Sequence, residues 1–360
     1  MHDFLAASGW GGAVVTPIPG DASTRRYSRL ADGPRRALLM DQPQGAETPA
    51  APPDAGTEQR RALGYNAMAR LAGADITRFA EVARYLKSRG LSAPEIYTAD
   101  AAAGFMILED LGDALFADVL AEGGDESALY TNAVAVLAKL HDEAAPGAMG
   151  TRPLFAYDET ALLAETDLFT EWYLPHALGR AATADESGTH RALWRAALAP
   201  VAAAPRVFVH RDYHAQNLIW LPQRAGAART GLIDFQDAVA GSRAYDLVSL
   251  LEDARRDVDP AVAREALRHY QDAMAAQGMP VDEAAFAAEM ATVAAQRNAK
   301  IVGIFARLFR RDGKPRYLAL LPRVWGHLET DLKHPSLAPL RAWYDRTIPR
   351  ATRFAEKETA

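Results

Sequence analysis

The chain has 360 residues, of which 49% are hydrophobic and 24% are charged, so it can bury a full core and has the length of about two domains. Its formal net charge is −6 and it has no basic run, which argues against nucleic acid or an anionic membrane as a partner. The absence of cysteine excludes disulfides, thiolate catalysis and cysteine-bound zinc. No signal-peptide pattern and no apolar run of membrane-spanning length is found, so we expect a cytoplasmic protein.

Strands and turns are expected to dominate the first 112 residues. The stretch "AVVTPIP" precedes the polar "GDASTRRY", and "ADGP" separates two apolar runs as a tight turn does. Residues 43–57 are rich in Pro, Ala and Gly without periodicity, which indicates a loop. Strands are predicted at 13–19, 27–30, 35–41, 93–100 and 104–112.

Helical periodicity occurs twice in this part and then prevails through the rest of the chain. In the second of these helices Phe79, Val82 and Leu86 share one face, and Gly90 stands where a C-cap glycine would. Helices are predicted at 58–73, 76–90, 128–143, 283–310, 316–332 and 336–346.

Three strand-like pieces, "RVFVH", "NLIWL" and "TGLIDF", lie close together in the otherwise helical half. The predicted fold class is therefore α+β. A small antiparallel β-rich lobe is expected over residues 1–110, with a connector near 109–113. A larger helical lobe is expected over 114–360.

The stretch "VFVHRDYHAQNLIWLP" contains Asp212 and, five positions later, Asn217. This is the H-R-D-x-x-x-x-N spacing of a kinase catalytic loop, in which the Asp reaches the attacking hydroxyl and the Asn reaches Mg²⁺. A second short apolar strand ends at Asp234, where a further magnesium-binding carboxylate is expected. One Asp in a turn is usually a cap or turn former, but three such residues in this order between strands predict catalysis by Asp212 and metal binding by Asn217 and Asp234.

These motifs resemble those of the aminoglycoside phosphotransferase and choline kinase superfamily, whose fold is two-lobed and protein-kinase-like. The second histidine of "HRDYHAQN", His214, and "LAKLHDEA" at 137–144 are part of the resemblance. The stretches "DASTRRY", "ILEDLGD", "GLIDFQDAVAGSRAYDLVSLLEDARRDV" and "PRVWGHLETDLKHPSLAPLRAWYD" are similar to a narrower group. That group comprises the kinases that phosphorylate the anomeric hydroxyl of N-acetylmuramate and N-acetylglucosamine in peptidoglycan recycling.

The polar loop 20–27 lies where such a fold places its phosphate-covering loop. Ser23 and Thr24 offer hydroxyl and main-chain N–H groups, and Arg25 and Arg26 are suited to phosphate oxygens. The loop is not G-x-G-x-x-G, so a plain polar hairpin turn is the alternative interpretation.

A kinase of this fold normally carries a lysine on its third strand. This chain has Met40 and Asp41 there, and its first lysine is Lys87. Either Arg25 or Arg26 replaces the lysine, or the protein is a degenerate nucleotide binder. We favour replacement, because the narrower group shares the "MD" sequence.

The segment "MILEDLG" is expected to form the hinge between the lobes. The resemblance implies that main-chain groups around Glu109 and Leu111 meet the adenine edge, and that Met106 or Ile107 packs on the ring. A strand that ends in a glycine turn is equally compatible with the pattern.

Substrate contacts are inferred from position. Trp172 and Tyr173 are suited to stacking on a sugar, although aromatics at helical spacing are more often core. Arg297 and Lys300 would suit an acidic group on the sugar, or else form a structural ion pair. The candidate substrate residues are His214, Gln236, Asp237, Trp172, Tyr173, Arg297 and Lys300.

The sequence therefore predicts an ATP- and Mg²⁺-dependent sugar kinase that phosphorylates the C1 hydroxyl of N-acetylmuramate and N-acetylglucosamine. We expect a monomer whose partners are the amino sugar and ATP, without nucleic acid or membrane. The alternatives are a kinase for another alcohol, of the aminoglycoside or choline type, and a nucleotide-binding pseudokinase that serves as a partner module.

Overall fold

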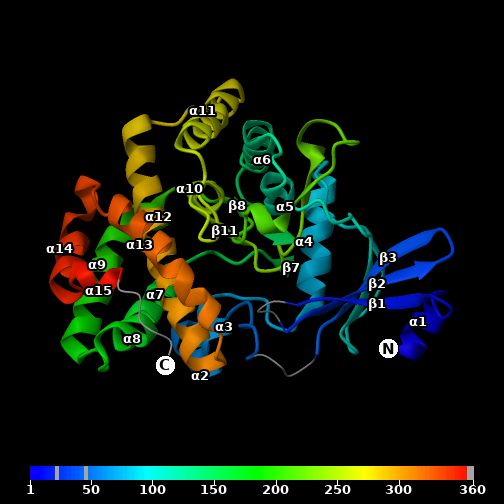
Figure 1. The fold of residues 1–360 in the computed structure, drawn as a ribbon, viewed down its shortest axis with the longest axis horizontal. Helices are drawn as coiled ribbons and strands as arrows, with labels where there is room; N and C mark the ends of the chain where they lie inside the picture. The colour runs from blue at the N-terminus through cyan, green and yellow to red at the C-terminus, as the bar shows by residue number, and fades with distance from the viewer. Residues whose placement is uncertain (21–23, 44–47, 355–360) are drawn as a thin grey trace. The chain divides into compact units, whose positions relative to one another are not determined.

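The computed structural model describes residues 1–20, 24–43 and 48–354 (Figure 1). The chain forms two compact units, each built from three stretches of sequence. Unit 1 comprises Met1–Leu140, Pro146–Phe155 and His210–Val239. Unit 2 comprises His141–Ala145, Ala156–Val209 and Ala240–Ala360.

The main sheet of unit 1 is fully antiparallel, with the strand order β1-β2-β3-β5-β4. Its β2–β3 turn is the predicted "ADGP" turn, where Gly33 takes a φ of 57° that glycine adopts without strain. The predicted strands are confirmed to within a few residues, as β1 (Val14–Ile18), β2 (Arg26–Asp32), β3 (Arg35–Asp41), β4 (Ile96–Asp100) and β5 (Phe105–Leu108).

Alternation along these strands gives the sheet two apolar faces. On one face, Leu30 of β2, Leu39 of β3 and Ile107 of β5 pack with Leu5 of α1 (His2–Ala7) and Trp10. On the other face, Met40 of β3 stands opposite Met106 of β5, and both are fully buried. The sheet is therefore held from both sides.

Of the three helices predicted in unit 1, 76–90 and 128–143 are confirmed to within a few residues, whereas α1 and α5 were not predicted. Phe79, Val82 and Leu86 are buried on one face of α4, and Gly90 follows this helix with a φ of 68°. The predicted helix 58–73 is broken at Gly64, whose φ of 102° does not fit a helix. Besides α1, the helices of the unit are α2 (Thr57–Leu63), α3 (Tyr65–Met68), α4 (Ile76–Ser88), α5 (Phe116–Ala121) and α6 (Glu126–Leu140).

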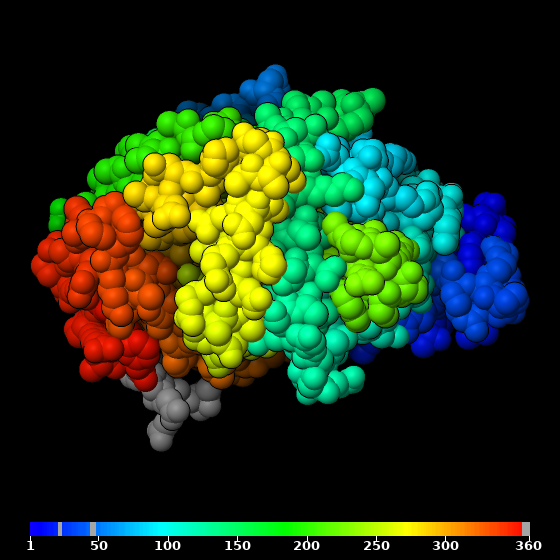
Figure 2. Space-filling model, turned by 90° about the horizontal axis from the view of Figure 1, so that it is seen from above, coloured from blue at the N-terminus to red at the C-terminus, as the bar shows by residue number. Residues whose placement is uncertain are grey.

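Unit 1 also contains two of the three strand pieces predicted around the kinase-like motif, those in "NLIWL" and "TGLIDF". β9 (Leu218–Trp220) pairs antiparallel with β10 (Thr230–Leu232). The connection between them carries η3 (Gly226–Arg229), which packs on α6 and stands at the surface in Figure 2, lime-green beside the teal of α5 and α6. A short pair, β6 (Ala148–Met149) and β7 (Arg152–Pro153), completes the unit.

Unit 2 is mainly helical and has a core of aromatic side chains. Phe169 packs against the rings of Tyr173, His190, Trp325 and Tyr344. The strands of the unit are β8 (Val207–Val209) and β11 (Val239–Gly241), which pair with each other. Its helices are α7 (Glu159–Leu168), the π-helix η1 (Phe169–Tyr173), α8 (Leu174–Leu178), α9 (Ala184–Ala203), α10 (Ala244–Leu251), α11 (Pro260–Ala276), α12 (Glu283–Asp312), α13 (Leu321–Asp331), α14 (Ala338–Thr347) and α15 (Arg350–Arg353).

The predicted arrangement of an antiparallel β-rich region followed by a mainly helical remainder is confirmed. Across the part of the chain that the structure describes, no helix combines the length and the apolar character needed to cross a membrane.

Candidate active site

The catalytic-loop motif forms a compact turn that leads into β9. Asn217 ends the short 3₁₀ turn η2 (Ala215–Asn217), and its main-chain N–H donates to the His214 carbonyl at 2.8 Å. The Asn217 side-chain Nδ2 donates to the main-chain carbonyl of Asp212 at 2.9 Å. The five-residue spacing therefore places the catalytic candidate and the metal-ligand candidate side by side.

Asp234 is brought to the same place by the next strand. Leu218 pairs with Leu232 at the end of the β9–β10 ladder, and the Ile233 N–H donates to the Asn217 carbonyl at 3.2 Å. Asp234 follows with a φ of 62°, and 43% of its side chain is exposed. The backbone thus turns at this residue and leaves a carboxylate beside Asn217 that a ligand can reach.

His210 lies beneath these polar groups. Its ring is fully buried and makes edge contacts with Tyr213 and Phe235. Burial lowers the pKa of His210, while the negative charges of Asp212 and Asp234 act in the opposite direction. The imidazole is therefore neutral at neutral pH and supports the loop from within the core.

The residues at this place fit a hard divalent cation. With its Nδ2 donated to a carbonyl, Asn217 turns its Oδ1 the other way, and Asp234 supplies a carboxylate next to it. Oxygen donors of this kind suit Mg²⁺, which keeps several ligands for water and phosphate. No group of three His, Asp or Glu side chains makes a complete metal cage among the residues that the structure describes.

Arg25, from the polar loop, reaches the same carboxylate. Its NH1 lies 3.2 Å from Asp234 Oδ1 and donates to Gln236 Oε1 at 2.8 Å. Its Nε donates to Gln42 Oε1 at 3.0 Å, and only 11% of the Arg25 side chain is exposed. Thr24 Oγ1 accepts from the Gln42 Nε2 at 3.1 Å, so the one amide of Gln42 joins both loop residues.

The other loop candidates have different environments. Arg26 pairs with Asp41 at 3.0 Å, and 68% of its side chain is exposed. Ser23 lies outside the described residues. At the strand position where a lysine was expected, Met40 is fully buried and accepts a contact from the Tyr27 hydroxyl at 3.6 Å. Of the two arginines, Arg25 is therefore the one in contact with the acidic site.

One of the hinge candidates, Leu111, belongs to a largely buried apolar cluster. Leu111 packs with Ile219 and Leu221, and Ile233 lies against this cluster. The same chain segments carry Asn217 and Asp234, so the apolar cluster adjoins the polar site. Ile219 was not selected from the sequence, although its place two residues after Asn217 would have pointed to it.

Glu109, another hinge candidate, forms hydrogen bonds through both its side chain and its main chain. Its Oε1 accepts from Arg224 at 2.8 Å, and its Oε2 accepts from the Glu95 N–H at 3.0 Å. Its own N–H donates to the Glu95 carbonyl at 2.8 Å. Met106 is buried opposite Met40, whereas Ile107 faces the α1 side of the sheet. Of that pair, Met106 is the one on the inner face.

Three of the substrate candidates belong to unit 1, where each lies within hydrogen-bonding distance of another residue of the unit. His214 is buried, with its Nε2 3.4 Å from Asn217 Nδ2. Gln236 donates from its Nε2 to Asp234 Oδ1 at 3.1 Å. Asp237 accepts from the Ala72 N–H at 2.6 Å, which ties it to the segment before α4.

The other four candidates belong to unit 2. Tyr173 is 2% exposed within the aromatic core, whereas Trp172, beside it on the π-helix, is half-buried. Arg297 donates to Ser249 Oγ at 2.9 Å and to the Glu252 carbonyl at 3.4 Å. The contacts of Tyr173 and Arg297 are those of core residues, which is the alternative interpretation of their pattern.

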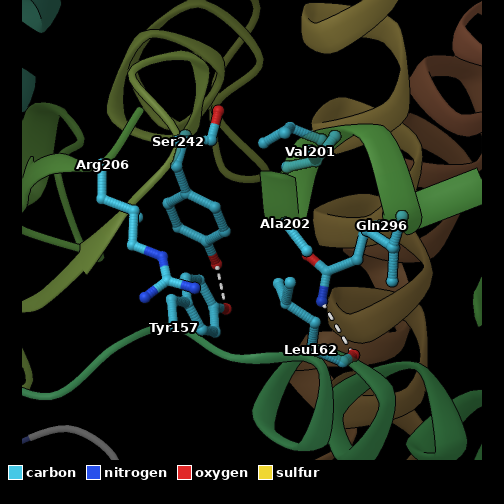
Figure 3. Close-up of a pocket in the computed structure, with 11 residues that line it drawn as sticks. Tyr157, Leu162, Val201, Ala202, Arg206, Ser242 and Gln296 are labelled. Carbon is cyan, nitrogen blue, oxygen red and sulfur yellow. Dashed lines mark hydrogen bonds between the residues drawn. The ribbon is translucent and has the colours of Figure 1, made fainter. Parts of the chain in front are cut away.

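Lys300 belongs to a buried polar network. Its Nζ lies 3.1 Å from Oε1 of the fully buried Glu165 and 3.0 Å from the Tyr245 hydroxyl. Tyr157 also donates to Glu165. Its hydroxyl lies 3.2 Å from that of Tyr245, a contact that a dashed line at Tyr157 marks in Figure 3. A buried carboxylate needs such partners, so the structural ion pair considered for Lys300 is present.

Comparisons with known proteins agree with this geometry. Residues 14–283 match the family model of the phosphotransferase enzyme family. An N-acetylmuramate/N-acetylglucosamine kinase of Caulobacter vibrioides is 45% identical over 354 residues, which are 97% of this chain and 96% of the relative. An enzyme of the same name from Pseudomonas aeruginosa is 32% identical over 346 residues, which are 94% of this chain and 91% of the relative.

The solved structures agree with the fold. A choline/ethanolamine kinase family protein from Mesorhizobium loti is similar with a TM-score of 0.57 at 15% identity, over 95% of this chain and 99% of that one. The predicted protein-kinase-like fold and the resemblance to aminoglycoside phosphotransferases and choline kinases are thereby confirmed. The family model matches three quarters of this chain, and the chain therefore belongs to the phosphotransferase enzyme family.

Proposed function

We propose that this protein is an ATP-dependent kinase that phosphorylates the C1 hydroxyl of N-acetylmuramate and N-acetylglucosamine. The observation that carries the proposal is the 45% identity, over nearly the whole chain, to a relative named for those two sugars. The grouping of Asp212, Asn217 and Asp234 within one compact unit supports the chemistry. Residues 1–110 would bind the nucleotide, with a hinge near 109–113, and 114–360 would supply catalysis and substrate binding.

Asp212 would act as the base. In the proposed reaction it takes the proton of the C1 hydroxyl while that oxygen bonds to the γ-phosphorus, and the bond from the γ-phosphorus to its bridging oxygen breaks as ADP leaves. An anomeric hydroxyl is more acidic than an ordinary alcohol, so a carboxylate suffices. Asn217 and Asp234 would hold Mg²⁺, which when bound neutralises phosphate charge as a Lewis acid.

The remaining parts of the nucleotide site follow from the same unit. Arg25 would contact the phosphates in place of the missing strand lysine, since it already contacts Asp234. The edge of the apolar cluster at Leu111, Ile219 and the partly buried Ile233 would receive the adenine ring. Because the donor is ATP and the net charge is −6, we propose a cytoplasmic monomer that acts on small molecules and not on nucleic acid.

The test is ADP release with Mg²⁺-ATP and N-acetylmuramate, N-acetylglucosamine, kanamycin or choline. We expect turnover with the two sugars, and a loss of about 10²–10⁴-fold in kcat for Asp212→Asn, because the base is removed while the fold is kept. Asp118→Asn, which alters an exposed carboxylate of α5, is the matched control. Phosphorus NMR of the product would establish the position of the phosphate.

Other outcomes would change the assignment. Turnover confined to kanamycin or choline would make the protein a kinase for amino alcohols. ATP binding without turnover of any substrate would support a pseudokinase, and the buried Met40 would then be its explanation.

A further inference from the structure

Arg25 already occupies the carboxylate to which the metal would bind. Its NH1 lies 3.2 Å from Asp234 Oδ1, and the same nitrogen donates to Gln236 Oε1. Asp234 Oδ1 also accepts from Gln236 Nε2 at 3.1 Å. The three side chains form a closed triangle in which the charge of one carboxylate is neutralised by a cation of the protein itself.

Two glutamine amides hold the guanidinium in this position. Gln236, 4% exposed, links Arg25 to Asp234. Gln42, 1% exposed, accepts from the Arg25 Nε through its Oε1, while its Nε2 donates to the hydroxyl of the loop residue Thr24. An amide offers an acceptor and a donor without charge, so it can orient an arginine without neutralising it. Arg25 is therefore aimed at Asp234 rather than resting on it by chance.

We propose that Arg25 is an internal counter-cation that keeps free Mg²⁺ off Asp234, so that the metal enters the site only together with the nucleotide. Gln42 and Gln236 are its positioning residues. The inference rests on the proposed function, because it takes Asn217 and Asp234 as the metal ligands.

The charges explain why Arg25 would oppose the binding of free metal at Asp234 but favour that of a metal–nucleotide complex. A free divalent cation at Asp234 would have to displace a guanidinium or stand beside it, and like charges at such distances repel. A metal–ATP complex brings an excess of negative charge, so Arg25 can leave the carboxylate and pair with phosphate oxygens. One arginine would thus oppose the metal alone and favour the metal–nucleotide complex.

The experiment measures Mn²⁺ as a probe for Mg²⁺, by its electron paramagnetic resonance, with the purified full chain and no nucleotide. We expect weak binding to the wild type and binding about tenfold or more tighter to Arg25→Met, because the competing charge is gone. The same variant, Arg25→Met, should bind a non-hydrolysable ATP analogue more weakly than the wild type does, because a phosphate contact is lost. A variant that merely loosened the site would weaken both.

Matched variants locate the effect. Arg26→Met removes an exposed arginine of the same loop and should leave Mn²⁺ affinity as in the wild type. Adding Asp234→Asn to Arg25→Met should abolish the gained affinity. If Arg25→Met does not fold, Gln42→Leu replaces it, since it frees the Arg25 Nε and should tighten Mn²⁺ binding to a smaller extent.

The inference is overturned if Arg25→Met binds free Mn²⁺ no more tightly than the wild type, or if the gain survives the loss of Asp234. A failed kinase assignment is distinguishable, because it would appear as absent sugar turnover while the Mn²⁺ measurements still report on Arg25 and Asp234.

Discussion

Arg211 and Asp234 are non-glycine residues with left-handed backbone, at φ values of 84° and 62°. Such a conformation costs about 1 kcal/mol or more and persists only where the surroundings enforce it. Arg211 is enforced by its buried side chain, and Asp234 follows directly on the hydrogen bond between Ile233 and Asn217. The strain is thus placed on the residues that adjoin Asp212 and supply the second carboxylate.

The buried Asp331 and the partly exposed Glu252 form an acidic pair in unit 2 that gives a prediction for one residue. Asn298 Nδ2 donates to Glu252 Oε2 at 2.7 Å and to Asp331 Oδ2 at 2.9 Å. Burial, and then the charge of Glu252, raise the pKa of Asp331. The folded state therefore holds a proton that the unfolded state has lost, and stability falls as the pH rises through the raised pKa.

We expect Asp331→Asn to remove this dependence, because its amide can donate to Glu252 without a charge. Relative to the wild type, the free energy of unfolding of the variant should increase between pH 4 and pH 8, as measured by urea denaturation. A constant difference between the two proteins across that range would contradict the prediction.

At the scale of elements, one close contact decides the packing of unit 2. A Cβ added to Gly303 of α12 would lie 2.5 Å from the carbonyl carbon of Leu168 and 2.7 Å from its Cβ. Leu168 ends α7 just before the π-helix η1. Only a glycine lets the long α12 approach the backbone at this point.

Gly303→Ala should therefore destabilise the protein by about 3 kcal/mol, because the backbone of α7 cannot yield as a flexible side chain would. The control is Gly326→Ala in α13, where an added Cβ meets nothing within 4 Å. That change should be neutral or stabilising by about 0.5–1 kcal/mol. Thermal melts of both variants compare them, and equal effects would refute the packing argument.

Periodicity alone predicted the elements whose pattern is local. The core face of α4 and the long helix α12 were both evident from apolar spacing. The break at Gly64 and the π-helix at Phe169–Tyr173 were not, because each depends on what packs against it. The close approach of Gly303 to Leu168 is a tertiary contact that no short window of sequence contains.

The same division applies to the site. Asp212 and Asn217 are five residues apart, so the motif implied their proximity, and the structure has it. The contact between Arg25 and Asp234 spans 209 residues, and the role of Gln42 in holding Arg25 had no signal in a local pattern. Sequence spacing predicts what a turn brings together, whereas these contacts are made by the packing of the unit.

At the scale of the whole molecule, each unit buries neutral histidines. His210 lies in unit 1, and His141 and His190 lie in unit 2, all at most 2% exposed. Burial lowers the pKa of His141 and of His190 to about 3. Below pH 6.5 these histidines are protonated in the unfolded chain but stay neutral in the folded one. The free energy of unfolding therefore falls as the pH falls toward 3.

His141→Asn should reduce this acid sensitivity, since it removes one such group. Between pH 6 and pH 4 the unfolding free energy of the variant should fall less steeply than that of the wild type, by about 1.4 kcal/mol per pH unit. Comparing slopes cancels the contributions of other groups, including Asp331. Parallel slopes would show that His141 takes no part.

Unit 1 is assembled from three separate stretches of chain, and its last stretch ends at Val239. During synthesis the N-terminal sheet leaves the ribosome long before Asp234, with which Arg25 pairs, has been translated. About a third of unit 2 is translated in between, so unit 1 cannot be completed before the synthesis of unit 2 has begun. An N-terminal fragment that ends within 156–209 would therefore lack Asp212, Asn217 and Asp234. The nucleotide site can form only late in translation, after Asp234 has been added.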